Sequence, residues 1–328
     1  MKIVLTCDAP ASSEVKGHLP EDIGAEHDAK STIRALTDAL ADNGHEVDVL
    51  RLTRDFPREI QQLDPDLVFN IAEGIRGRTR EAIVPSWLDH LAIPYTGSDG
   101  LTLSLTLDKA RAKEIVRGRG VRTPNFRRVS HLDQLSTSQL EFPLFVKPVG
   151  EGSSMGIRFS SRVNDPEELE NQVTWVLEEY DQPCLVEEFA PGPEYCVGFL
   201  GNGNPKTLPI IEVKCEGSFY SYEHKNQHKK KLTCPADISP NLTRKLIRMA
   251  RRSFHAFDCR DLARVDLKID AEGHPTFLEI NPLPGLNPDF SIYPHQAEAG
   301  GIRYNTLIGQ IVSLAAERNM PKTERIPS

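Results

Sequence analysis

The segment from Leu262 to Asn281 constrains the fold of this chain more than any other stretch of its sequence. Hydrophobic and polar residues alternate on both sides of Asp270–Gly273, and these four residues are typical of a tight turn. Such alternation indicates β-strands, because successive side chains of a strand point to opposite faces. The pattern therefore predicts an antiparallel hairpin in the C-terminal part of the chain.

One face of this hairpin is expected to carry charged and amide side chains. On the first strand, the residues that share this face are Arg264, Asp266 and Lys268. On the second strand, the face opposite to that of Leu278 and Ile280 is shared by Phe277, Glu279 and Asn281. Folding about the turn brings Asp266 roughly opposite Glu279, so two carboxylates and an amide oxygen converge beside an arginine.

The oxygen atoms gathered on this face suit Mg²⁺, which usually binds few carboxylates and completes its shell with phosphate oxygens and water. Arg264 is then placed to pair with a developing phosphoryl or carboxylate charge. The same residues are also compatible with a solvated hairpin face on which Arg264 and Asp266 form a surface ion pair. Both interpretations remain open at this point.

The first hundred residues alternate between predicted strands and helices. Short apolar runs predict strands at residues 3–7, 47–52 and 67–71, and a one-sided apolar pattern predicts a helix over residues 29–43. This β–α–β order is typical of a parallel sheet covered by helices. Further along, the pattern predicts strands at residues 142–149, 184–188, 194–200 and 209–213, and helices at 108–117, 166–180 and 240–257. We expect a chain of mixed α/β and α+β class.

Composition and charge narrow the functional classes. At 328 residues the chain is long enough for two or three domains. The net charge of -8 gives no support to nucleic-acid binding, and no apolar stretch approaches the ~20 residues of a membrane span. The six cysteines form no CxxC pair, which indicates reduced thiols, and Met1 leads directly into the first predicted strand. We expect a soluble cytoplasmic protein that binds neither nucleic acid nor membrane.

A glycine-rich turn follows the predicted strand that contains Lys147. The sequence from Phe145 to Gly156 reads FVKPVGEGSSMG, so three glycines and two serines come after this lysine. Glycines let a backbone approach phosphate closely, and successive N–H groups form an anion-binding nest. The motif differs from a P-loop, because the lysine precedes the glycines and no Gly-Lys-Ser/Thr follows. An ordinary hairpin turn is the alternative interpretation.

Several short motifs follow one another in a characteristic order. They are Lys147-Pro148 and residues 151–154 (EGSS), 186–189 (VEEF), 192–194 (GPE), 264–266 (RVD) and 279–285 (EINPLPG), preceded by residues 94–97 (PYTG) and 107–109 (LDK). This order resembles that of D-alanine–D-alanine ligases of the ATP-grasp superfamily. The resemblance extends from about residue 64 to residue 316 and rests on the co-occurrence of the motifs.

The resemblance implies an ATP-grasp fold of three domains, with ATP held between two antiparallel sheets. It implies an N-terminal parallel α/β domain over residues 1–106, a central domain over 107–187 and a C-terminal, metal-binding domain over 188–328. By position, it assigns Lys109, Lys147 and Lys225 to the phosphates, Glu187, Phe189 and Ala190 to adenine, and Glu194 to the ribose. It assigns Asp266, Glu279 and Asn281 to two Mg²⁺ ions, with Mn²⁺ as an alternative metal. An exposed strand edge is the other interpretation of Glu187 and Glu188.

The chemistry that the resemblance implies starts with a carboxylate that is activated as an acyl phosphate and then attacked by an amine. Metal ions and lysines are expected to neutralise the phosphoryl oxygens and to hold the reacting groups in line. Arg264 and the backbone N–H of Gly285 match the donors that hold the oxyanion. The loop of residues 217–226 resembles the one that closes over ATP, and Lys225 takes the position next to the γ-phosphate. The family is commonly dimeric, so a homodimer is a further expectation.

Three positions depart from the family pattern at the substrate site. Glu26 is a candidate for binding the ammonium of the first amino acid, but the valine–serine pair expected after it is absent, and an exposed helix-leading carboxylate is the alternative. Asn226 replaces a tyrosine that bonds to the serine of the glycine-rich turn, here Ser153. Phe290 stands where a serine holds the carboxylate of the second amino acid, and Ser291 follows one position later.

The leading hypothesis is an ATP- and Mg²⁺-dependent carboxylate–amine ligase that acts on amino acids or related amines. A D-alanine–D-alanine ligase of peptidoglycan biosynthesis, or a close relative, fits best. One alternative is a ligase of specialised metabolism with a different amine acceptor. Another is a nucleotide-binding module without catalysis, which the retained metal-ligand set argues against because such a module need not keep it.

Overall fold

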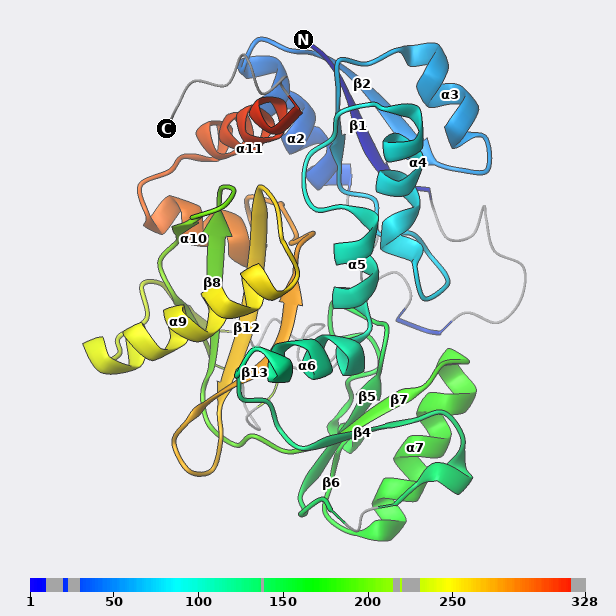
Figure 1. Ribbon diagram of the computed structural model, residues 1–328, viewed down its shortest axis with the longest axis vertical. Helices are drawn as coiled ribbons and strands as arrows, with labels where there is room; N and C mark the ends of the chain where they lie inside the picture. The colour runs from blue at the N-terminus through cyan, green and yellow to red at the C-terminus, as the bar shows by residue number, and fades with distance from the viewer. Residues whose placement is uncertain (10–19, 23–29, 137–138, 215–218, 220–230, 320–328) are drawn as a thin grey trace.

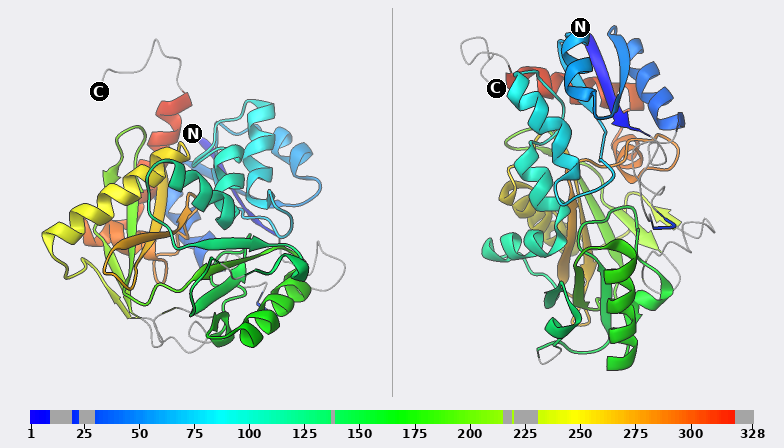
Figure 2. Two further views of the ribbon diagram at one scale, coloured as in Figure 1. Left: turned by 60° about the horizontal axis from the view of Figure 1, so that its bottom comes forward. Right: turned by 90° about the vertical axis from the view of Figure 1, so that its right-hand side faces the viewer.

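The computed structural model describes residues 1–9, 20–22, 30–136, 139–214, 219 and 231–319. Within this part of the chain the strands form three sheets, one parallel and two antiparallel. The parallel sheet lies at one end of the molecule, and the smaller antiparallel sheet lies at the other end with helix α7 beside it (Figures 1 and 2). The larger antiparallel sheet lies between them.

The N-terminal sheet has the strand order β2-β1-β3, and all its strands are parallel, as the sequence predicts. Its strands are β1 (Lys2–Asp8), β2 (Glu46–Leu52) and β3 (Leu67–Asn70). The helices of this region are α2 (Lys30–Asp42), α3 (Phe56–Leu63) and α4 (Ile83–Leu91). Apolar side chains of α2 pack on one face of the sheet, and those of α3 and α4 pack on the other.

The C-terminal end of the chain completes the N-terminal core. Helix α11 (Tyr304–Asn319) contributes Leu307, Ile308 and Ile311 to the cluster that contains Ile3 and Leu36. Figure 1 shows α11 beside α2 at the top of the molecule, next to the N-terminal sheet. Two segments almost 300 residues apart in sequence are thus buried together. Helix α11, which the predicted boundary at residue 188 assigns to the C-terminal domain, shares this core both with the N-terminal sheet and with C-terminal residues such as Leu262 and Leu286.

The smaller antiparallel sheet has the order β4-β7-β5-β6. Its strands are β4 (Phe126–Val129), β5 (Leu144–Pro148), β6 (Arg162–Val163) and β7 (Cys184–Glu188). Helix α7 (Pro166–Tyr180) covers one face, since Leu169, Val173 and Val176 are buried against this sheet. Asp165 caps α7 by accepting the N–H of Glu168, and Pro166 fits the first turn because its missing N–H has no helical partner there.

The larger antiparallel sheet has the order β11-β10-β8-β12-β13, and β9 pairs with β8. Its strands are β8 (Glu194–Leu200), β9 (Lys206–Thr207), β10 (Ile211–Lys214), β11 (Lys231–Thr233), β12 (Leu262–Ile269) and β13 (Pro275–Asn281). Helix α9 (Pro240–Ala256) and helix α6 (Lys109–Gly118) pack on the face that buries Val265 and Phe277. The opposite face is left to line the cleft described below.

The remaining helices connect these layers. They are α5 (Gly100–Leu107) and α10 (Ile292–Ala299), together with the short 3₁₀ helices η2 (Arg80–Ala82), η3 (Leu132–Gln134) and η4 (Phe159–Ser161). In the described part of the chain, none of the helices has both the length and the apolar character that crossing a membrane requires. Among the described cysteines none is disulfide-bonded, and four of the five are buried.

The predicted hairpin is present, but one strand departs from simple alternation. Asp266 pairs with Glu279, as predicted, whereas Leu267 pairs with Phe277 because the register shifts at this point. The resulting β-bulge leaves Leu278 as the extra residue on β13. Phe277 therefore faces the buried core with Leu267, and the prediction that it shares a face with Glu279 is wrong.

Candidate active site

A cleft of about 700 Å³ lies between the two antiparallel sheets and reaches the N-terminal domain. Its volume is within the range of small-molecule sites. The candidate residues that line it are Lys109, Lys147, Ser153, Glu187, Phe189, Ala190, Glu194, Arg264, Asp266, Glu279, Asn281, Gly285 and Ser291. The structure thus brings together thirteen of the fifteen predicted site residues, whereas Glu26 and Lys225 lie outside the described residues, as does Asn226.

The polar end of the β12–β13 ribbon forms a compact charged group. Arg264 binds Asp266 through two nitrogens, with Nε–Oδ1 at 2.8 Å and Nη2–Oδ2 at 2.7 Å. The amide nitrogen of Asn281 donates to the same carboxylate at 3.0 Å. Arg264 and Asp266 are mostly buried, with exposed side-chain fractions of 18% and 7%. The Arg264–Asp266 ion pair therefore exists, but it lies inside the cleft and not on a solvated surface.

Glu279 stays ionised because cations surround it. Burial on its own raises the pKa of this carboxyl group, but the charges of Lys109, Lys147 and Arg264 outweigh it and bring the pKa to about 2. The nearest of these ion pairs joins Lys109 Nζ and Glu279 Oε2 at 3.5 Å. The carboxylate is charged at neutral pH, as a metal ligand must be.

The oxygen donors at this end of the ribbon fit a magnesium ion. Asp266 and Glu279 supply carboxylates from adjacent strands, and Asn281 supplies an amide. Its amide nitrogen now faces Asp266, so turning the amide over would offer its oxygen to a cation. A site with few carboxylates, open to a cleft that can hold phosphates, is what Mg²⁺ usually occupies.

A buried ion triad lies at the wall of the cleft that contains Lys147. Lys147 Nζ and Lys113 Nζ lie 2.7 Å and 2.9 Å from the two carboxylate oxygens of Glu187. Lys113 also donates to the carbonyl of Phe277 at 3.0 Å and is completely buried. Burial lowers the pKa of Lys113 to about 8, although Glu187 opposes this shift. Burial raises the pKa of Glu187, but the two lysines outweigh it and leave the carboxyl pKa below its usual value.

The position of Glu187 excludes the alternative of an exposed strand edge. Its strand, β7, pairs with both β4 and β5, so it is an inner strand of the sheet. The Glu187 side chain is only 3% exposed. A buried carboxylate between two lysines fixes where the amine of Lys147 lies in the cleft.

We expect Lys113→Met to lower the free energy of unfolding by about 3–5 kcal/mol, because it leaves a buried carboxylate with one of its two cations. Chemical denaturation followed by circular dichroism measures the change. Lys245→Met, on the exposed side of α9, is the matched control and should change stability by less than about 0.5 kcal/mol. A Lys113→Met protein as stable as the control would contradict this role of the triad.

The glycine-rich turn presents its backbone to the cleft in a conformation that few residues adopt. Ser153 and Ser154 have φ values of 49° and 65°, and Gly156 has a φ of 72°. A Cβ atom at Gly156 would lie 2.3 Å from Cγ of Pro148, so only glycine fits there. Lys109 Nζ donates to the backbone carbonyl of Glu151 in the same turn. This turn and the buried Lys109 and Lys147 form one wall of the cleft.

Aromatic side chains line one end of the cleft, where β7 ends and β8 begins. Phe145 and Phe189 stack with ring centroids 6.0 Å apart, and Phe219 meets both rings edge-on at 5.1 Å and 6.2 Å. Lys268 Nζ lies 6.0 Å from the centroid of Phe189. Flat apolar rings of this kind suit a nucleobase, and Glu194 on the neighbouring strand lines the same cleft.

Ser291 and Phe290 both line another side of the cleft, but they differ in their surroundings. Ser291 Oγ accepts the backbone N–H of Asn287 at 3.1 Å. A Cβ atom at Gly285 would lie 2.9 Å from the same Oγ, so the hydroxyl lies directly over this glycine. Phe290 is 61% exposed. Of the two neighbouring residues, Ser291 is the one that offers a hydroxyl beside Gly285.

Sequence reasoning missed Lys113, Phe145, Phe219 and Lys268 as parts of this site. A signal for Lys113 was present, since it shares the buried stripe of α6 with Lys109, Ala112 and Val116. A lysine on the buried side of a helix needs an acidic partner, and that partner could have been sought. The aromatic cluster left no such signal, because its members come from segments that are distant in sequence.

Comparisons with known proteins show what this chain is similar to in sequence and in fold. The family described as D-ala D-ala ligase C-terminus matches residues 119–313. A D-alanine–D-alanine ligase of Carboxydothermus hydrogenoformans is 34% identical over 86% of this chain and 92% of its own length. The uncharacterized protein y4sG of Sinorhizobium fredii is 39% identical over 77% of this chain and 75% of its own. In fold, the chain is similar to a Bacillus anthracis D-alanine–D-alanine ligase solved with ATP, with a TM-score of 0.78, 24% identity and coverage of 97% and 98%.

Proposed function

Because the chain belongs to the D-alanine–D-alanine ligase family, whose members are ATP-dependent ligases with the ATP-grasp fold, we propose that it joins a carboxylate to an amine through an acyl phosphate. The observation that carries this proposal is the meeting of two groups across one cleft. The oxygen ligands of the β12–β13 ribbon lie on one side, and the amines of Lys109 and Lys147 lie on the other. This pairing suits a phosphoryl group and the metal that accompanies it.

We propose roles for the residues of the cleft from these positions. Lys109 and Lys147 hold the phosphates, and the serines of the glycine-rich turn, Ser153 included, contribute backbone N–H groups. Adenine is placed at the aromatic end, near Phe189 and Ala190, with Glu194 at the ribose. Glu187 then acts mainly by fixing Lys147, because both its carboxylate oxygens are engaged by lysines.

For the metal, we propose that Asp266, Glu279 and Asn281 hold two Mg²⁺ ions, with Mn²⁺ as a substitute. Bound there, the ions would neutralise phosphoryl oxygens and polarise the group that is transferred. The chain itself keeps Glu279 ionised through Lys109 and keeps Asp266 in place through Arg264. These ion pairs orient both carboxylates before any ligand binds.

The transfer to the amine needs donors for a developing oxyanion. Arg264 uses Nε and one terminal nitrogen on Asp266, and both Arg264 and Gly285 line the cleft. We propose that the guanidinium and the N–H of Gly285 together stabilise the tetrahedral oxyanion. When the amine attacks the acyl carbon, the C–O bond to phosphate breaks and inorganic phosphate leaves with one former carboxylate oxygen.

For the substrates, we propose small amino acids or related amines, with D-alanine as the first candidate because relatives carry the name D-alanine–D-alanine ligase. A ligase of specialised metabolism with another amine acceptor is the second candidate, and the Asp289-Phe290 pair beside the acceptor side favours testing it. We further propose that the protein acts in the cytoplasm, where a peptidoglycan precursor dipeptide would be made. Whether it forms a dimer can be tested by light scattering.

An ADP-release screen tests the proposed function. The purified protein is incubated with ATP, Mg²⁺ and single or paired amino acids of both configurations, and ADP and phosphate are measured. Release that depends on an amino acid supports the ligase, and mass spectrometry of the product identifies the acceptor. If none of the amino acids or amines causes ADP release, the result contradicts catalysis and favours a nucleotide-binding module.

We propose that the hydroxyl of Ser291 binds the carboxylate of the acceptor amino acid. We expect Ser291→Ala to raise the KM for the acceptor on the order of 10- to 100-fold, because a hydrogen bond to a charged group contributes about 1.5–3 kcal/mol. The KM for ATP should stay nearly constant, since this hydroxyl lies over Gly285 and away from the aromatic end. Phe290→Ala serves as the neighbouring control, because that ring is mostly exposed. A larger effect from Phe290→Ala than from Ser291→Ala would assign the acceptor contact to position 290.

A further inference from the structure

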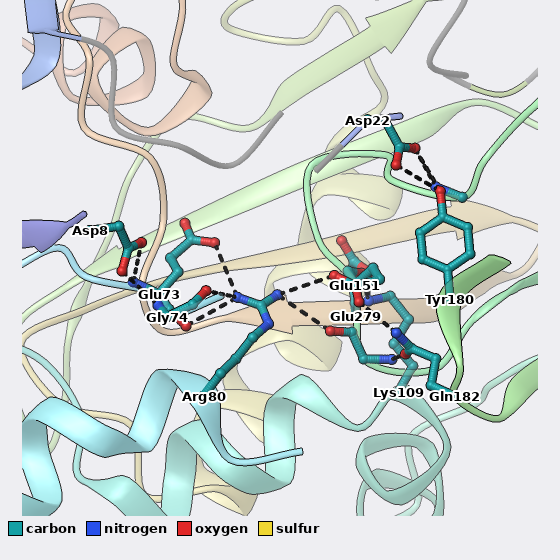
Figure 3. Close-up of polar contacts among 12 residues, drawn as sticks. Asp8, Asp22, Glu73, Gly74, Arg80, Lys109, Glu151, Tyr180, Gln182 and Glu279 are labelled. Atoms are coloured by element: carbon teal, nitrogen blue, oxygen red, sulfur yellow. Dashed lines mark hydrogen bonds and ion pairs between the residues drawn. The ribbon is translucent and has the colours of Figure 1, made fainter. Parts of the chain in front are cut away.

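Arg80 occupies a buried position between the N-terminal domain and the glycine-rich turn. It begins η2 and is only 3% exposed. Its Nη1 donates to the carbonyls of Glu73 and Gly74 at 3.1 Å and 3.3 Å, and its Nη2 donates to the carbonyl of Gly150 at 3.3 Å. Two carboxylates flank it, Glu73 Oε2 at 3.8 Å and Glu151 Oε2 at 3.6 Å. Figure 3 shows the guanidinium between these two groups.

The N-terminal partners of Arg80 are themselves fixed. The backbone N–H groups of Glu73 and Gly74 donate to the Asp8 carboxylate at 2.9 Å and 2.8 Å. Asp8 is the last residue of β1, the central strand of the parallel sheet, and it is buried. Arg80 therefore extends a rigid connection from the N-terminal sheet toward the cleft.

Another partner of Arg80, Glu151, contacts Lys109, which is one of the two lysines proposed to bind phosphate. The carbonyl of Glu151 accepts the amine of Lys109, which also lies 3.5 Å from Glu279. Gln182 reinforces the same corner, because it donates to Glu151 Oε1 and accepts the N–H of Gly150 at 2.8 Å. Arg80 thus contacts the residue whose carbonyl holds Lys109.

The far end of the glycine-rich turn is held by a second N-terminal residue. The carboxylate of Asp22 accepts the N–H of Gly156 at 2.9 Å and the hydroxyl of Tyr180 at 2.8 Å. Asp22 is only 2% exposed. Residues 150–156 are therefore held at both ends, by Arg80 of the N-terminal domain at one end and by Asp22, which also binds Tyr180 of α7, at the other (Figure 3).

We propose that Arg80 is a positioning residue, which holds the start of the glycine-rich turn against the N-terminal domain while Asp22 holds the far end of the turn, and so sets the place of Lys109. This proposal rests on the proposed function for its effect on turnover, but the positioning itself is a property of the ligand-free protein. A turn with three glycines has much backbone freedom, and fixing it before the nucleotide binds avoids that ordering cost during catalysis. Arg80 also connects the N-terminal domain, which is expected to bind the first substrate, to the wall of the cleft that contains Lys109 and Lys147.

Hydrogen exchange of the ligand-free protein tests the positioning directly. We expect the backbone amides of residues 150–156 to exchange at least about tenfold faster in Arg80→Gln and in Asp22→Asn than in the wild type, with Arg80→Lys in between. Arg78→Gln is the matched control, because Arg78 lies two residues away with a side chain that is 74% exposed. Unchanged exchange of this turn in folded Arg80→Gln, or an equal increase in Arg78→Gln, would overturn the proposal.

Turnover gives a second, separate measurement. With the substrate found in the ADP-release screen, Arg80→Gln should lower kcat on the order of 10- to 100-fold, while the KM for ATP changes less than about threefold. Arg80→Lys should recover part of kcat, because it keeps the charge between Glu73 and Glu151. If the wild-type protein shows no turnover with any substrate, the proposed function is contradicted. The hydrogen-exchange experiment still decides the role of Arg80 in that case.

Discussion

Glu279→Gln is expected to lower kcat on the order of 10³-fold and to leave the fold intact. Metal ions contribute several kcal/mol of charge stabilisation to phosphoryl transfer, and each 1.36 kcal/mol corresponds to a factor of ten in rate. The amide of Gln is neutral, so the charge that Lys109 and Arg264 now compensate would disappear. Steady-state ADP release and a circular dichroism spectrum measure the two parts of this prediction.

Glu272→Gln is the matched control for this variant. The control makes the same chemical change on the same ribbon, at the exposed turn between β12 and β13, where Glu272 pairs with Arg122. Its turnover should equal that of the wild type, because exposed ion pairs contribute little. Equal turnover in Glu279→Gln and Glu272→Gln would remove the ribbon carboxylate from the mechanism.

The second large effect is expected for Arg264→Lys, with a loss in kcat on the order of 10²- to 10³-fold. A lysine keeps the positive charge but offers one nitrogen, and that nitrogen cannot bind Asp266 through two bonds and also serve an oxyanion. Binding of ATP, measured by calorimetry with the amino acid absent, should change little, since this donor acts on the second half of the reaction.

Arg260→Lys provides the comparison for this substitution. Arg260 pairs with Asp99 at 2.6 Å just before the same strand begins, and it does not line the cleft. Its replacement should leave kcat within about twofold of the wild-type value, because a lysine keeps the positive charge beside Asp99 and the position lies outside the cleft. If Arg264→Lys retains wild-type kcat, an oxyanion role for this guanidinium is wrong.

Local sequence patterns predicted much of this fold because the periodicities were clear. The bounds of α7, β7, β8 and β12 agree with the predicted ones to the residue. Their ends are marked by strong local signals, such as the Asp165-Pro166 pair that starts α7. Helices α3, α4, α5, α10 and α11 were not predicted. Three of these five helices have only eight residues, and their apolar positions match partners from distant parts of the chain.

The β-bulge on β13 explains the one wrong side-chain assignment. Strict alternation places Phe277 on the same face as Glu279, but the extra residue Leu278 shifts the register by one. Burial of the Phe277 ring in the core below α9 favours this shift. Alternation along a single strand contains no information about such a partner, so the bulge could not be read from the sequence.

The candidate site was predictable where a short sequence motif contains the charged residues themselves. It was not predictable where residues from different elements meet only in the folded protein. The carboxylates of the ribbon and the lysine before the glycine-rich turn come from short segments with recognisable patterns. Lys113 and Arg80 instead depend on partners in other elements, namely Glu187 and Glu151. Charged residues of this kind resemble surface residues until the packing around them is known.

Transfer of oxygen-18 tests most directly the claim that a carboxylate is activated as an acyl phosphate. The substrate found in the screen is labelled at its carboxylate oxygens and incubated with ATP, Mg²⁺ and the acceptor, and the released phosphate is examined by mass spectrometry. One labelled oxygen should appear in each phosphate, because the carboxylate oxygen that bonds to phosphorus leaves with it. Unlabelled phosphate, or release of AMP instead of ADP, would contradict the account.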